Sequence, residues 1–209
     1  MGEASRQRTL ATAAKRGTDI LGAAVGLIAL APLLAGLALL VKATSRGPAF
    51  YRQTRIGRLG RPFTVYKLRT MHVGAHERRR HLMPLNDVPT GPLFKVRNDP
   101  RVTRIGRVLR RCSLDELPQL WNVLTGTMSI VGPRPALPEE VARYEPHVYG
   151  RLLVKPGITG LWQVSGRSDL SWDESVRLDL YYARNWSFAL DAQILLRTVV
   201  AVLSGRGAY

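Results

Sequence analysis

The chain has 209 residues and a formal net charge of +16 at pH 7. This length favours one domain with an appendage over two complete domains. The charge excludes an electrically neutral surface and indicates a polyanionic partner: a nucleic acid, an anionic membrane surface or a phosphorylated small molecule. The single cysteine, Cys112, excludes an internal disulfide framework and fits a reducing compartment.

An uncharged and strongly apolar segment covers residues 20–41. As one straight helix it would rise about 33 Å, which is enough to span a bilayer. Pro32 is expected to break or kink this helix, and the resulting halves would reach only about 18 and 13 Å. Basic residues flank both ends, which predicts that both ends are cytoplasmic. Two alternatives therefore stay open: a kinked span and a re-entrant helix that returns to the same face.

Beyond this segment, residues 50–53 and 63–68 are aromatic or β-branched and are separated by a glycine-containing turn, which predicts a short β-hairpin. Residues 72–98 mix charge with proline and glycine and predict an irregular loop. Residues 101–111 are amphipathic and predict a helix. Its arginines form either a solvated basic face or a phosphate-facing surface.

In the last part of the chain, residues 129–139 are rich in proline and predict a structured loop. Residues 172–184 and 188–204 have helical periodicity, and the apolar side of the second helix fits either the core or a membrane interface. The sequence thus predicts a mostly α protein with a short β-hairpin, an α+β fold.

Adjacent carboxylates, Asp115 and Glu116, are the first candidates for chemistry. One interpretation is structural, because Ser113 followed by Glu116 matches a capping box at a helix start. The other is chemical, because Arg110 lies just upstream, and helix N-termini beside cationic side chains bind anions. An aspartate with an ordinary pKa near ~3.9 is ionised at neutral pH and could attack a phosphate whose charge is neutralised by cations or a metal.

Further cations have a setting that suggests phosphate contact. Arg134 lies between Pro133 and Pro135, which fix the backbone around it, and Lys67 and Arg69 lie at the end of the second predicted strand. In so basic a chain, any one of these cations taken alone indicates only a charge on the surface. They become candidates for phosphate binding because each is expected at a position where the backbone is held by prolines or by a strand.

These residues resemble the bacterial sugar transferase family, the monotopic polyprenyl-phosphate phosphoglycosyl transferases. The resemblance extends over nearly the whole chain and rests on these blocks: Lys15-Arg16-x-x-Asp19, Pro32, Tyr51-Arg52-Gln53, Tyr66-Lys67-Leu68-Arg69-Thr70-Met71, Ser113-Leu114-Asp115-Glu116-Leu117-Pro118-Gln119-Leu120, Ser129-Ile130-Val131-Gly132-Pro133-Arg134-Pro135, Lys155-Pro156-Gly157-Ile158-Thr159-Gly160 and Leu178-Asp179-Leu180-Tyr181-Tyr182.

The resemblance implies a location on the cytoplasmic face of the bacterial inner membrane. Residues 1–48 would form a re-entrant membrane helix broken at Pro32, and residues 49–209 a small catalytic domain with interfacial helices. The implied reaction transfers a phospho-sugar from a UDP-sugar to undecaprenyl phosphate, releases UMP and initiates exopolysaccharide or glycoconjugate assembly. Membrane lipids are therefore expected partners.

The resemblance also implies roles for single residues. Asp115 matches the nucleophile that holds the phospho-sugar covalently and would also be a Mg²⁺ ligand, and Glu116 matches the second acid of the dyad, with a role in positioning or in proton and metal management. Six further residues are candidates for contact with the donor or its surroundings: Lys67, Arg69, Arg110, Arg134, Arg167 and Asp179.

Three alternatives compete with this reaction. A nucleic-acid-binding protein would leave the apolar segment without a purpose, and the sequence has no zinc spacing, helix-turn-helix punctuation or RNA-binding aromatic pattern, so no nucleic-acid partner is expected. A basic membrane scaffold without activity is the second. Direct transfer in a ternary complex, with Asp115 as a metal ligand, is the third. The identity of the sugar and the oligomeric state, including a homodimer, stay open.

Overall fold

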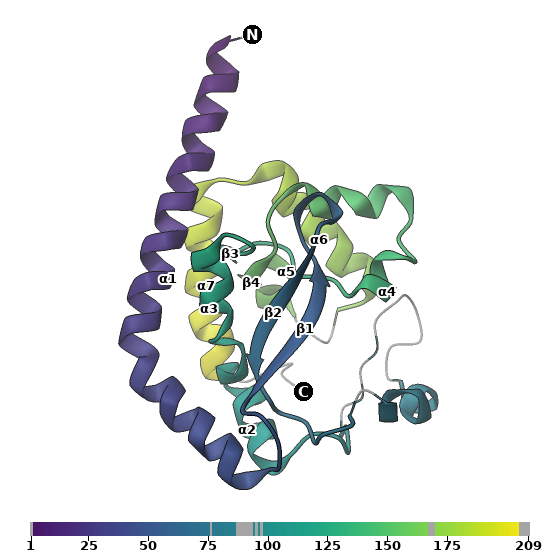
Figure 1. Ribbon diagram of the computed structural model, residues 1–209. Helices are drawn as coiled ribbons and strands as arrows, with labels where there is room; N and C mark the ends of the chain where they lie inside the picture. Colours follow the sequence, from purple (N-terminus) through teal and green to yellow (C-terminus); the bar gives the residue numbers. More distant parts are fainter. Residues whose placement is uncertain are drawn as a thin grey trace.

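The computed structural model describes residues 2–75, 77–86, 94, 96, 98–166 and 170–204. These residues form a mostly helical protein with two small two-stranded sheets, which confirms the predicted mixture of helices with little β-structure. In Figure 1 the long N-terminal helix lies along one side of a compact group of short elements. The elements that carry the fold are α1 (Gly2–Thr44), β1 (Phe50–Ile56), β2 (Pro62–Leu68), α2 (Arg104–Arg111), η3 (Leu114–Glu116), α3 (Gln119–Thr125), β3 (Ser129–Val131), α4 (Pro138–Val141), η4 (Pro146–Leu153), β4 (Gly157–Thr159), α5 (Leu161–Ser165), α6 (Trp172–Asn185) and α7 (Phe188–Ser204).

Helix α1 continues through Pro32, so the break predicted at this position is wrong for the backbone. The helix bends instead, and Figure 1 shows the change in direction along its length. Proline removes one backbone hydrogen bond and crowds the preceding turn, which kinks a helix without necessarily ending it. The segment from Leu10 to Thr44 is long and apolar enough to cross a membrane.

The first half of α1 packs on the rest of the protein through small residues at helical spacing. Ala23 is fully buried, and a Cβ added to Gly22 or Gly26 would lie 2.7 Å from Ile130 Cδ1 or 3.2 Å from Leu120 Cδ1. The missing side chains therefore allow the helix to approach β3 and α3 closely. Asp19 fixes the register, because its Oδ1 accepts hydrogen bonds from Ser129 Oγ and from the Ile130 backbone N–H, both at 3.0 Å.

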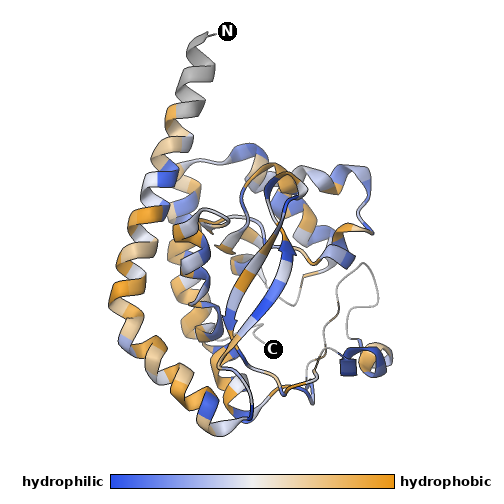
Figure 2. Ribbon diagram, viewed as in Figure 1, coloured by the Kyte–Doolittle hydropathy of each residue, from blue (hydrophilic) through white to orange (hydrophobic). Residues whose placement is uncertain are grey.

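The second half of α1 contacts a different part of the same body. Val41 is 2% exposed and belongs to a hydrophobic cluster with Leu68 of β2 and Leu109 of α2. Between these two contact regions the helix exposes apolar side chains, with Ile28 at 78% exposure. Helix α1 is thus attached to the protein on both sides of a bare apolar stretch, which Figure 2 colours as hydrophobic.

The predicted hairpin is confirmed and is longer than expected. Strands β1 and β2 pair antiparallel, from Phe50 opposite Leu68 to Ile56 opposite Pro62. Asn122 of α3 binds the other edge of β2, because its side chain accepts from the Tyr66 N–H at 3.1 Å and donates to the Thr64 carbonyl at 2.7 Å. These bonds satisfy edge groups of the strand and hold α3 against it.

The amphipathic helix is also confirmed, as α2. Thr103 caps its start by accepting a hydrogen bond from the Gly106 N–H at 2.9 Å. A Cβ at Gly106 would lie 2.1 Å from the Thr70 carbonyl oxygen, so glycine allows α2 to lie directly on the chain that leaves β2. The expected irregular region of residues 72–98 contains a 3₁₀ helix, η2 (Glu77–Leu85).

The C-terminal third has more regular structure than the sequence predicted around residues 129–139. Strand β3 pairs parallel with β4, and α4 begins at Pro138, so the expected loop is confined to the residues between them. The two C-terminal helices are confirmed as α6 and α7. Helix α7 buries Ile194 completely but exposes Leu196 and Leu203 at 72% and 82%, so one side joins the core and the other is bare.

Candidate active site

The two acids of the candidate dyad lie in the 3₁₀ turn η3, which follows α2 after one residue in a left-handed conformation. That residue is Ser113, at φ 55° and ψ 20°, and its side chain makes no capping hydrogen bond. The capping-box interpretation is therefore wrong here, because an N-cap needs an extended backbone to turn its oxygen toward the helix. A left-handed serine is uncommon and reverses the chain sharply. The reversal brings Asp115 and Glu116 next to β2.

Asp115 is a buried carboxylate, with 8% of its surface exposed. Burial raises its pKa above the ordinary value, and Glu116 adds to the increase, whereas Lys67 and Arg110 oppose it. Among the residues that the structure describes, no side chain forms an ion pair with this carboxylate. Asp115 is therefore a carboxylate near cations that has no ion-pair partner among the described residues.

Glu116 engages the nearest cation. Its Oε1 lies 2.5 Å from Lys67 Nζ, which projects from β2. Burial acts to raise the pKa of Glu116, but Lys67, followed by Arg134 and Arg55, holds it below the ordinary value. Glu116 is thus the firmly ionised acid of the dyad. Its bond to Lys67 leaves the neighbouring carboxylate of Asp115 without a salt-bridge partner.

Arg110 reaches the site from the last turn of α2. Its Nε donates to Thr70 Oγ1 at 3.0 Å, which holds the side chain over the end of β2. Burial lowers the pKa of this guanidinium, while Asp115 and Asp99 act to raise it. An arginine stays charged at neutral pH despite such a shift. Arg110 therefore provides fixed positive charge beside Asp115.

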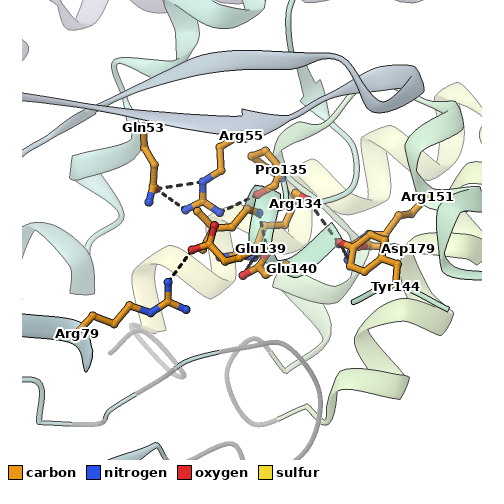
Figure 3. Close-up of polar contacts among 11 residues, drawn as sticks. Gln53, Arg55, Arg79, Arg134, Pro135, Glu139, Glu140, Tyr144, Arg151 and Asp179 are labelled. Atoms are coloured by element: carbon orange, nitrogen blue, oxygen red, sulfur yellow. Dashed lines mark hydrogen bonds and ion pairs between the residues drawn. The ribbon is translucent and has the colours of Figure 1, made fainter. Parts of the chain in front are cut away.

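Arg134 lies on the segment between β3 and α4, and Figure 3 shows its side chain beside Glu140. Its Nη1 lies 3.1 Å from Glu140 Oε2, and Glu140 also accepts a hydrogen bond from the Leu137 N–H at 2.9 Å. Burial acts to lower the pKa of Arg134, but Glu140 raises it above the ordinary value. The charge of Arg134 is also one of the causes that lower the pKa of Glu116.

The other candidates from the sequence have different surroundings. Arg69 is buried at the end of α1, where its Nη2 donates to the Ser45 carbonyl at 2.8 Å, so it joins the hairpin to that helix. Asp179 is 1% exposed and forms a buried ion pair with Arg151 (Figure 3). Burial raises the pKa of Asp179 to about 6. Arg167 lies outside the described residues.

Sequence reasoning missed three residues of this network: Arg55, Glu140 and Arg151. Arg55 is buried and donates from Nη1 to the Pro135 carbonyl at 2.9 Å, across 80 positions in the chain. A usable signal was the spacing of Gln53 and Arg55, because residues two apart on a strand share one face. Glu140 lies three residues after Leu137, whose backbone N–H it binds at the start of α4, so a helix start at Pro138 was the available signal. Arg151 gave no local signal for its ion pair, since Asp179 lies 28 positions away.

The fit of a divalent cation depends on Asp115 and Glu116. Among the described residues, no group of three or more His, Cys, Asp or Glu side chains gathers closely enough to hold a metal. Mg²⁺, however, is often bound by one or two carboxylates together with phosphate oxygens of a substrate. The free carboxylate of Asp115 fits that mode, in which the substrate completes the coordination.

The arrangement combines a buried carboxylate, which has no ion-pair partner among the described residues, with three cations whose charges act on the dyad: Lys67, Arg110 and Arg134. Cations in such positions can bind a phosphate and offset the repulsion that it would meet from Asp115. The geometry therefore suits attack of a carboxylate on a phosphorus atom.

Comparison with known proteins agrees with this chemistry. The family model described as bacterial sugar transferase matches residues 10–205. The chain is 45% identical over 199 residues to the undecaprenyl-phosphate galactose phosphotransferase of Salmonella typhimurium, covering 93% of this chain and 41% of that protein. It is 45% identical over 200 residues to the UDP-galactose-lipid carrier transferase of Erwinia amylovora, with 93% and 41% covered.

A third relative has nearly the same length as this chain. The exopolysaccharide production protein ExoY of Rhizobium meliloti is 41% identical over 210 residues, which cover 99% of this chain and 93% of that protein. The Salmonella and Erwinia proteins are longer, and the chain spans about two fifths of their length.

Proposed function

The chain belongs to the bacterial sugar transferase family, and we propose that it transfers a phospho-sugar from a UDP-sugar to undecaprenyl phosphate, releasing UMP. This step would begin the assembly of an exopolysaccharide or another glycoconjugate. The names of the relatives from Salmonella and Erwinia support the donor and acceptor classes. The observation that carries the mechanism is the buried carboxylate of Asp115, which has no ion-pair partner among the described residues while cations surround it.

The proposed reaction has two displacements at the same phosphorus. A carboxylate oxygen of Asp115 attacks the β-phosphorus of the donor, an O–P bond forms, and the bond from that phosphorus to the bridging oxygen breaks as UMP leaves with the electron pair. A phosphate oxygen of the acceptor then attacks the aspartyl phospho-sugar. The Asp115 carboxylate leaves, which restores the enzyme and completes the diphosphate of the lipid-linked sugar. Neither displacement requires a base, because both nucleophiles are already anionic.

The neighbours of Asp115 explain how an anion could attack another anion. The charge of Arg110 acts on the pKa of Asp115 and that of Arg134 on the pKa of Glu116, and both cations would stabilise the phosphate oxygens as charge moves during the displacement. Glu116 holds Lys67 in a 2.5 Å ion pair, which fixes the ammonium near the phosphate site and keeps it from capturing the nucleophile. Mg²⁺, which Asp115 could hold with donor phosphates, would supply further charge neutralisation when bound.

We also propose that residues 1–48 enter and leave the bilayer on its cytoplasmic side, with residues 49–209 as the catalytic domain. Helix α1 packs on that domain on both sides of its apolar middle, at Ala23 and again at Val41. A straight span would carry one of these regions, together with the polar surface it contacts, into the lipid, which is costly. The bend at Pro32 and the exposure of Ile28 support re-entry, and the bare side of α7 would lie at the membrane interface.

The first experiment measures UMP release from a panel of UDP-sugars by protein in nanodiscs, with undecaprenyl phosphate and Mg²⁺. Wild type should release UMP with at least one donor, and Asp115→Asn should not. Asp173→Asn is the matched control, because Asp173 is an exposed acid in the first turn of α6 and should leave the rate unchanged.

A second measurement separates the covalent route from direct transfer. Wild type incubated with donor and no acceptor should release about one UMP per enzyme and carry a phospho-sugar on Asp115, detectable by mass spectrometry of intact protein. Release that strictly requires the acceptor would favour a ternary complex. A folded wild-type protein that releases no UMP from any donor would favour the basic membrane scaffold.

A further inference from the structure

The segment that carries Arg134 is anchored through its backbone to an unusual extent. Four successive carbonyl oxygens accept hydrogen bonds from three different elements of the fold. The donors, in order along residues 133–136, are the Gly157 N–H at 2.8 Å, Arg151 Nη2 at 3.4 Å, Arg55 Nη1 at 2.9 Å and the Ile56 N–H at 2.9 Å. Two of these donors are buried arginine side chains, Arg55 and Arg151.

Arg55 is held rigidly in its position on β1. Gln53, two residues earlier on the same strand, accepts from its Nε at 3.1 Å and its Nη2 at 2.7 Å, so the guanidinium plane is fixed (Figure 3). Burial, reinforced by the like charge of Arg134, lowers the pKa of Arg55 to about 10. A buried cation beside a second cation opposes folding. The hydrogen bond from Arg55 to the Pro135 carbonyl indicates that the contribution of Arg55 is to hold residues 133–136 in place.

Arg151 forms the second anchor from η4. Its guanidinium is paired with the buried carboxylate of Asp179 and donates from Nη1 to the Tyr144 hydroxyl at 3.0 Å. It also lies over the ring of Trp172, 5.6 Å from the centroid. With these contacts fixed, Nη2 reaches the Arg134 carbonyl. Asp179 therefore acts on this segment through Arg151 and does not face the dyad.

The anchored backbone fixes the orientation of the Arg134 side chain. Pro133 and Pro135 fix φ on either side of Arg134, and the four anchored carbonyls restrict the remaining rotations. Glu140 binds one end of the Arg134 guanidinium through Nη1, and among the described residues no partner engages Nε or Nη2. The preorganised fork keeps these donors available for an anion.

We propose that Arg55 and Arg151 are positioning residues, which lock residues 133–136 and so aim the Arg134 guanidinium at the phosphates of the donor. This inference rests on the proposed function. Neither arginine needs to touch substrate. A displacement of about 1 Å in a substrate-binding group can cost about 100-fold in rate, which is the scale on which such anchoring matters.

A double-mutant cycle tests the proposal. In UMP release with the preferred donor, Arg55→Lys should lower kcat/KM by about 10-fold or more, because lysine keeps the charge but cannot bind Gln53 and Pro135 together. In an Arg134→Ala background the same change should have less than about a twofold effect, since nothing is left to position. An undiminished effect in that background would overturn the proposal, as would wild-type kinetics for Arg55→Lys.

The matched control is Arg58→Lys. Arg58 is an exposed arginine three positions further along the chain, and it too donates to a backbone carbonyl, that of Leu153 at 3.2 Å. Its replacement should leave kcat/KM unchanged. If Arg55→Lys does not fold, Gln53→Met removes the partner that fixes the Arg55 guanidinium and keeps the arginine. This change should lower kcat/KM when Arg134 is present and have little effect in the Arg134→Ala background. Absence of that dependence would also count against the proposal.

A readout independent of catalysis separates this inference from the proposed function. Hydrogen exchange of the amides in residues 134–141 should accelerate in Arg55→Lys and remain at the wild-type rate in Arg58→Lys. Unchanged exchange in Arg55→Lys would overturn the positioning role. If wild type turned over no UDP-sugar, the proposed function would fail, and the exchange measurement would still decide whether Arg55 anchors the segment.

Discussion

Replacing the proposed nucleophile should make the protein more stable. Asp115 is a buried carboxylate without an ion-pair partner among the described residues, and burial raises its pKa. A carboxyl that holds its proton more tightly when folded costs the fold stability as the pH rises from about 4 through its folded pKa, so the cost is greater at pH 7 than at pH 4. Asp115→Asn keeps the shape and removes the charge.

The expected gain is about 1 kcal/mol, the usual scale for relieving a strained functional residue, and it corresponds to an increase in Tm of roughly 2–4 °C in a domain of this size. The assay is thermal unfolding in detergent, followed by tryptophan fluorescence at pH 7 and pH 4. The Tm difference between Asp115→Asn and wild type should be largest at pH 7 and should shrink toward pH 4.

Asp99→Asn is the matched control with the opposite sign. Burial acts to raise the pKa of Asp99, but the hydrogen bonds and charge of Arg101 lower it, and the two side chains form a buried 2.6 Å ion pair. Loss of that charge should lower the Tm at pH 7. A lower Tm for Asp115→Asn, or a change of equal sign in both variants, would refute the reasoning that Asp115 is held ionised at a cost to the fold.

Three further predictions follow from the same contacts. Single-turnover UMP release should fall on the acid side with a midpoint above pH 3.8, because the raised pKa of Asp115 leaves its carboxylate protonated at a higher pH than an ordinary aspartate; a rapid-quench profile from pH 4 to 7 measures this, and a midpoint at or below 3.8 would contradict it. Burial acts to raise the pKa of Glu140, but Arg134 and the Leu137 N–H hold it below 4.5. Ionised Glu140 therefore stabilises the fold above about pH 4.5, and this contribution is lost as the pH falls through its folded pKa. In urea unfolding, the difference in stability between wild type and Glu140→Gln should be greatest at pH 7, and a difference that grew in acid would contradict this prediction. Gly106→Ala should destabilise the protein by about 3 kcal/mol or more, because the added Cβ would lie 2.1 Å from the Thr70 carbonyl oxygen. The control Gly36→Ala, whose Cβ would have no atom within 4 Å, should be neutral or stabilising by up to ~1 kcal/mol. Equal Tm values for the two variants would contradict the close packing of α2.

Local patterns in the sequence were sufficient for most elements. The hairpin, α2, α6 and α7 were predicted because each depends on side-chain periodicity and turn residues within one short stretch. The ordered motifs likewise indicated the family, which the comparison confirmed, and the dyad of Asp115 and Glu116, which stays a prediction. The same local reasoning failed at Ser113, where a capping pattern met a left-handed backbone that the sequence does not reveal.

The tertiary structure decided which cations matter and how each is used. Among 31 lysines and arginines, only the spacing of Gln53 and Arg55 offers a local signal for Arg55, and the Pro135 carbonyl and Asp179 that Arg55 and Arg151 bind lie 80 and 28 positions away. Pairing of β1 with β2 and packing of α6 on η4 bring these groups together, and burial then turns ordinary surface charges into fixed donors. The sequence by itself determined the family, the long apolar segment and the acid that we propose as nucleophile. The distances that leave Asp115 free, pair Glu116 with Lys67 and hold Arg134 in place exist only in the folded chain, because they join residues that the sequence keeps far apart.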